Sequence, residues 1–200
     1  MAMARSHSTR YTAVAMTLHW LIAAAIVVLL AAGLWMTDAI KQPETKNFAF
    51  KVYQWHKALG LTVLVLSVVR LAWRLANPPP PWPAGRTAFE RFAASATHAL
   101  FYALMIAIPL AGWAVVSASP FGFPTMIFGL FEWPHVPMLA GLSPEDKKPA
   151  EALFKAAHKY MGWGLMALLV LHVGAALKHH FVNRDGVFAR MLPGASKSSA

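Results

Sequence analysis

The sequence predicts an all-α fold, a transmembrane four-helix bundle. Of its 200 residues, 58% are hydrophobic and only 13% are charged, whereas soluble domains average about 25% charged residues. Four apolar stretches are each long enough to cross a hydrocarbon core about 30 Å thick, which takes about 20 helical residues. They comprise residues 18–36, 58–75, 98–116 and 160–177.

These stretches predict one integral membrane domain over residues 1–200, with helices at about 17–36, 56–76, 96–116 and 156–178. The first stretch is longer than the apolar region of a signal peptide, which has about 7–15 residues, and no convincing cleavage site follows it. We therefore expect it to remain in the protein as the first membrane helix.

The basic residues predict the orientation in the membrane. The net charge is +10, but the basic residues are interleaved with the apolar stretches and form no basic domain, which argues against nucleic acid as a partner. All the arginines fall on the side of the two termini, whereas the opposite side carries only lysines and most of the acids. The positive-inside rule then places both termini in the cytoplasm. The arginines are Arg5, Arg10, Arg70, Arg74, Arg86, Arg91, Arg184 and Arg190.

The segments that connect the apolar stretches differ in composition. Residues 77–85 read NPPPPWPAG, which cannot be helical because proline lacks a donor and restricts its neighbour. The outer loop 117–155 is apolar and aromatic but is broken by prolines, so a membrane span there would leave unpaired backbone in lipid. We expect short helical turns on the outer membrane surface, and a disordered polar tail after His180.

Histidines in the apolar stretches indicate the chemistry. His158 and His172 are fourteen residues apart on the fourth helix, which is about four turns, or roughly 21 Å, and keeps them within about 40° of one face. Ionisable residues inside the membrane are costly and face partners in the bundle. Histidine also ligates haem iron, and without cysteine neither thiolate ligation nor covalent c-type attachment is possible.

Depth in the membrane sorts four histidines into two pairs. His56 opens the second helix at the outer side, level with His158, and His19 opens the first helix at the cytoplasmic side, level with His172. Two such pairs would enclose two haem b groups, one above the other, which indicates electron transfer across the membrane. His98 is also at cytoplasmic depth and competes with His19 as a ligand. An interfacial histidine with a satisfied hydrogen bond is the alternative at each position.

Charged residues near these pairs have two interpretations. Arg70 and Arg74 share one face of the second helix and either neutralise the propionates of the inner haem or anchor the helix at the interface. Lysines around the outer pair either guide a small anion or form an ordinary solvated surface. These lysines are Lys41, Lys46, Lys51, Lys57, Lys147, Lys148, Lys155 and Lys159. His179 and His180 are expected to be a solvated pair at a helix end.

Local motifs add a family resemblance. The chain contains LHW at residues 18–20, YQWHKALG at 53–60, VRLAWRLANPPPP at 69–81, HALFYALMIAIPLAGW at 98–113, KAAHKYMGWGL around His158 and LHVGAALKHHFVNRDGVFARMLP at 171–193. Over nearly its whole length it resembles the bacterial cytochrome b561 family of di-haem inner-membrane proteins. The resemblance implies that His19, His56, His158 and His172 ligate the iron and that His98 does not.

The resemblance also implies quinone as the electron partner and, for close bacterial members, superoxide oxidation at the outer face with ubiquinone reduction. Two histidines on one iron leave no open position, so the expected chemistry is one-electron transfer at a haem edge and no side chain is expected to be catalytic. One alternative is the cytochrome b subunit of a membrane dehydrogenase or hydrogenase, whose protein partner the sequence does not identify. A second, of another class, is a haem-free transporter with histidines as a proton relay.

Overall fold

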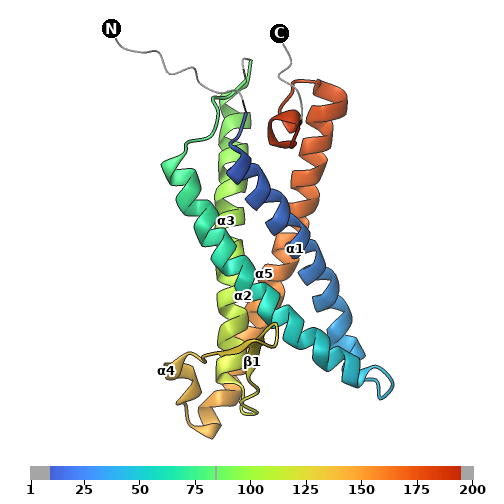
Figure 1. The fold of residues 1–200 in the computed structure, drawn as a ribbon, viewed down its shortest axis with the longest axis vertical. Coiled ribbons are helices and arrows are strands. Elements are labelled where there is room, and N and C mark those ends of the chain that lie inside the picture. Colours follow the sequence, from blue (N-terminus) through green and yellow to red (C-terminus); the bar gives the residue numbers. More distant parts are fainter. Residues whose placement is uncertain (1–9, 84, 195–200) are drawn as a thin grey trace.

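The chain folds into four long helices, which confirms the predicted fold class. The computed structural model describes residues 10–83 and 85–194. Each of the four helices is long and apolar enough to cross a membrane. They are α1 (Ala13–Ala39), α2 (Lys46–Ala76), α3 (Ala88–Ala118) and α5 (Pro144–Lys178). Figure 1 shows that α1 begins and α5 ends at one end of the bundle, as an even number of crossings requires.

The helices extend beyond the apolar stretches because capping residues lie further out. The Ser143 side chain accepts the N–H of Asp146, and Pro144 occupies the first turn, so α5 begins well before residue 156. Thr87 and Glu90 form a reciprocal capping box at the start of α3. The apolar pattern therefore locates the membrane crossing, while the capping residues decide where each helix starts.

The four helices meet around a small apolar core. Its buried members are Ile22 and Ile26 of α1, Val63 of α2, Met105 of α3 and Leu165 of α5. Many large apolar side chains point outward instead, such as Val170, which is 68% exposed. An apolar exterior of this extent is unsuited to water and suits a lipid environment, in which the helices satisfy their own backbone groups.

The outer segment between α3 and α5 differs from the expected short helical turns. It contains an antiparallel hairpin of β1 (Thr125–Ile127) and β2 (Phe131–Trp133), followed by one short helix, α4 (Pro137–Ala140). Phe128 and Gly129 both have positive φ, which is the backbone geometry of a tight hairpin turn. This turn brings the two strands together, so the expectation was wrong for β1 and β2 and correct for α4.

The inner end of the bundle, which is the end where α1 begins and α5 ends, is closed by the C-terminal segment. After α5 the chain makes a π-helical turn, η1 (His179–Asn183), and a 3-10 turn, η2 (Phe188–Met191). The Trp20 indole N–H donates to the Met191 carbonyl at 2.9 Å, which attaches the segment to α1. The predicted disorder after His180 is therefore wrong as far as residue 194, and the last six residues lie outside the described part.

Candidate functional site

The outer histidine pair joins α2 to α5. The rings of His56 and His158 have centres 6.2 Å apart and planes 68° from parallel, and both residues are half-buried. The structure thus brings together the two histidines that were matched by depth.

One ring of this pair has a defined tautomer. His158 Nδ1 lies 2.8 Å from the carbonyl oxygen of Ile108 in α3. A carbonyl only accepts, so Nδ1 carries the proton and donates it. Nε2 is left with its lone pair, which is the form of imidazole that binds a metal.

The inner level contains three histidines. The ring centres of His19 in α1 and His172 in α5 are 6.3 Å apart, while His98 in α3 lies 5.9 Å from His172. Phe101 packs against the same His172 ring at 5.2 Å. The structure brings His19 to His172 as expected, and it also brings in the competitor, so ring distance alone does not choose between them.

The ring separations fit one metal ion between two imidazoles. A metal–imidazole bond is about 2 Å long and the ring centre lies about 1.2 Å further, which places two opposed ring centres about 6.4 Å apart. The Nδ1 atoms of His19 and His56 are buried without a hydrogen-bond partner among the described residues. Within those same residues no cluster of three or more His, Asp or Glu could hold a bare ion. A pair of opposed imidazoles suits a metal whose other ligands come from a macrocycle.

The two arginines of α2 lie beside the inner level. The guanidinium carbons of Arg70 and Arg74 are 5.8 and 5.9 Å from the centre of the Tyr102 ring. Both arginines line a small hollow with Tyr11 and Trp73, and the charge of Arg70 acts on all three inner histidines. Their positions suit the neutralisation of acidic groups at the inner site.

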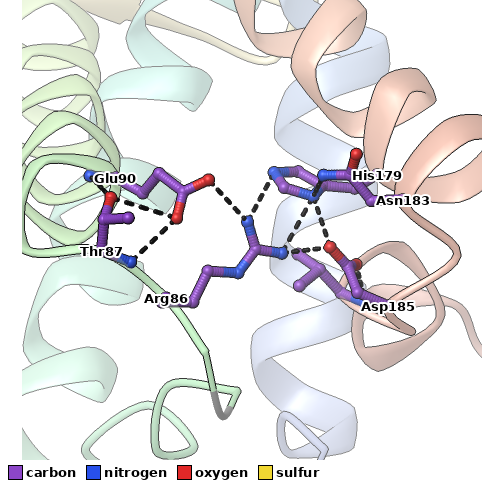
Figure 2. Close-up of polar contacts among 7 residues, drawn as sticks. Arg86, Thr87, Glu90, His179, Asn183 and Asp185 are labelled. Atoms are coloured by element: carbon purple, nitrogen blue, oxygen red, sulfur yellow. Dashed lines mark hydrogen bonds and ion pairs between the residues drawn. The ribbon is translucent and has the colours of Figure 1, made fainter.

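A partly buried ionic cluster lies at the inner end of α3 and α5, and the sequence had not indicated it. Figure 2 shows Arg86 between Glu90 of α3 and the side chains of His179 and Asp185. The Arg86 side chain is only 10% exposed and forms an ion pair with Asp185. His179 Nδ1 lies 2.7 Å from Asp185 Oδ2, so the expected solvated pair is wrong for His179. The expectation of a solvated side chain is correct for His180, which is exposed.

The cluster favours the ionised form of Asp185. Partial burial opposes ionisation, but the Val187 N–H, the His179 ring and the charge of Arg86 together hold the pKa of Asp185 below its usual range. The cluster depends on the chain returning after η1, and hydrophobic periodicity carries no information about that return.

The outer end is closed by hydrogen bonds to backbone carbonyls. The Lys57 ammonium and the Gln54 amide of α2 both donate to the Pro124 carbonyl, at 2.7 and 3.2 Å. The Trp113 indole of α3 donates to the Pro134 carbonyl at 2.8 Å. The outer segment is thus attached to α2 and α3, and Lys57 has a structural contact as well as its charge.

Comparison with known proteins identifies the family. The family described as prokaryotic cytochrome b561 matches residues 10–194. The chain is 33% identical to "Cytochrome b561 homolog 2" of Escherichia coli (strain K12) over 184 residues, which cover 92% of this chain and 91% of that one. It is 30% identical to "Probable superoxide oxidase CybB" of Yersinia pestis over 189 residues, covering 92% and 96%. The chain belongs to the prokaryotic cytochrome b561 family.

Membership gives the class of cofactor and chemistry. This is a membrane electron-transfer protein, and the family uses b-type haem. The paired, half-buried histidines at the two levels fit such a group.

Proposed function

We propose that the protein holds two haem b groups and moves single electrons between a donor at the outer face and the quinone pool. The observation that carries this proposal is the presence of two histidine pairs, fourteen residues apart along α5, with ring separations of 6.2 and 6.3 Å. His56 and His158 would ligate the outer iron, and His19 and His172 the inner iron. Haem b, when bound, supplies a one-electron carrier at each level.

The roles of the protein residues follow from their positions. Four histidines on three helices hold the two levels at separate depths, and α5 spans both. Arg70 and Arg74 would bind the acidic groups of the inner haem, because their charges lie beside the inner histidines. Two histidines would hold each iron, so the haem would supply one-electron transfer without binding a substrate at the metal.

The most specific form of the proposal is superoxide oxidation coupled to ubiquinone reduction. Two superoxide anions each lose one electron and become O2, and ubiquinone gains the two electrons and two protons to become ubiquinol. The name of the Yersinia pestis relative supports this reaction. Exposed Lys51 and Lys159 near His56 and His158 would attract the anion.

The proposed location is the bacterial inner membrane, with both termini in the cytoplasm. The arginine-bearing segments support this orientation through the positive-inside rule. A reporter fused to the C-terminus should be active only if it is of a cytoplasmic type. External labelling of the C-terminus would reverse the assignment of sides.

One reconstitution experiment tests the function. Purified protein in vesicles that contain ubiquinone should show a low-spin b-type spectrum and should form ubiquinol when superoxide is generated outside. A haem spectrum without reaction with superoxide would point to a quinol-linked carrier or a dehydrogenase subunit. Absence of haem from protein supplied with haem during expression would contradict the proposal and favour a histidine proton relay.

A further inference from the structure

Gly112 of α3 is the position at which the His158 ring reaches the backbone of a neighbouring helix. A Cβ at Gly112 would lie 3.0 Å from Cε1 and 3.1 Å from Nδ1 of His158. Carbon atoms pack at about 3.5–4.0 Å, so any side chain at this position would push the ring away. A side chain at this position would therefore require the His158 ring to move by a few tenths of an ångström.

The His158 ring donates to one backbone acceptor, the Ile108 carbonyl. Ile108 and Gly112 are one helical turn apart, and a helical side chain leans over the turn that precedes it. A side chain at position 112 would therefore cover the Ile108 carbonyl. Glycine leaves this carbonyl accessible, and its second lone pair accepts the His158 Nδ1–H at 2.8 Å, beside the helical N–H.

We infer that Gly112 and the Ile108 carbonyl form a positioning site for His158, which fixes the tautomer and orientation of the outer ligand. The inference rests on the proposed role of His158 as an iron ligand. A ligating imidazole that donates its other N–H becomes more basic, which stabilises the oxidised metal. The hydrogen bond therefore lowers the reduction potential of the outer site.

The second outer histidine is held differently and supplies a matched control. Gly33 of α1 faces His56, but a Cβ there would lie 3.4 Å from the His56 Cε1 atom, which is ordinary contact. His56 Nδ1 has no hydrogen-bond partner among the described residues. Adding a methyl group at Gly33 should therefore leave its ligand in place, whereas the same methyl at Gly112 should not.

Gly112→Ala and Gly33→Ala test the inference on purified holoprotein by haem quantitation, redox titration and electron paramagnetic resonance. In Gly112→Ala we expect either loss of the outer haem alone or a raised outer potential with a changed low-spin signal. Gly33→Ala should keep two haems with wild-type potentials. If Gly112→Ala retains wild-type potentials and signals, the positioning site is refuted.

A measurement on the wild type covers the case in which Gly112→Ala does not fold. Low-spin ferrous haem is diamagnetic, so proton NMR of the reduced protein resolves the ring N–H signals of the ligands. His158 Nδ1–H should resonate further downfield than His56 Nδ1–H and exchange more slowly with deuterium. Equal shifts and rates for both histidines would overturn the inference, whereas a wild type without two haems would refute the proposed function instead.

Discussion

The outer and inner levels both bring histidine rings together, but the residues around the rings differ. The outer pair consists of His56 and His158, is flanked by two glycines, and uses a backbone carbonyl to orient one ring. The inner level packs a third histidine, His98, against His172 and places arginines beside it. The outer level is therefore shaped by close backbone approach, and the inner level by charge.

The ends of the bundle show the same contrast. The outer segment is attached to α2 and α3 through hydrogen bonds to proline carbonyls, which do not titrate. The inner end is closed by the ion pair of Arg86 with Asp185 and by its neighbours His179 and Glu90 (Figure 2). Acid should consequently loosen the inner end and leave the outer end intact.

Substitution of the ionic cluster should give the largest of the local effects. Arg86→Ala leaves Asp185 and His179 without their cation, which should cost about 1–3 kcal/mol of stability because a hydrogen bond to a charged group is lost. Thermal loss of the inner haem, followed by absorbance, should occur at lower temperature than in the wild type. Equal sensitivity of both haems would mean that the cluster does not act on the inner level in particular.

The pH dependence of the cluster has a definite sign. The pKa of Asp185 is lowered in the folded state, so its contribution to stability is full above the unfolded pKa and is lost as pH falls through the folded pKa. Asp185→Asn should remove this part of the acid sensitivity. Thermal denaturation of both proteins across the acid range measures it, and parallel pH profiles would contradict the assignment.

Removal of the inner arginines should change one potential and spare the other. Arg70→Gln or Arg74→Gln takes a positive charge from the inner level, which favours the oxidised iron. A change of about 1 kcal/mol, typical of a nearby partly screened charge, corresponds to about 40 mV for one electron. Redox titration should show the inner potential falling, and a fall at the outer level would place these arginines at the wrong site.

Outer lysines should give the smallest effect, visible only at low ionic strength. Lys51→Gln with Lys159→Gln should slow the reaction with superoxide a few-fold, because exposed charges are screened beyond about 8–10 Å near physiological salt. Reduction by a neutral quinol analogue serves as the control. Lys57 is left unchanged because it also donates to Pro124. A superoxide rate that is insensitive to salt and to both substitutions would remove the steering effect.

The sequence predicted the parts of this structure that depend on periodicity and depth. Apolar length located the four spans, and helical rise matched His56 with His158 and His19 with His172. The β1–β2 hairpin was missed because its turn depends on the conformation of Phe128 and Gly129 and not on an apolar pattern. The hydrogen bond from His158 to the Ile108 carbonyl could not be predicted, because residue spacing along one helix does not indicate which backbone group of a neighbouring helix a side chain contacts.

The arrangement of the inner histidine level and the Arg86 ion pair could not be predicted from the sequence either. His98 was expected at cytoplasmic depth, yet only the three-dimensional arrangement shows that its ring lies as near to His172 as that of His19 does. Arg86 and Asp185 are 99 residues apart, a separation for which a single sequence offers no signal.

Haem content of five single variants tests the central claim, that two histidine pairs hold one haem each. We predict two haems per chain in the wild type, loss of the outer haem alone in His56→Ala and His158→Ala, and loss of the inner haem alone in His19→Ala and His172→Ala. His98→Ala should retain both. Loss of the inner haem in His98→Ala with both haems retained in His19→Ala would contradict the inner pairing, and loss of both haems in every variant would contradict two independent sites.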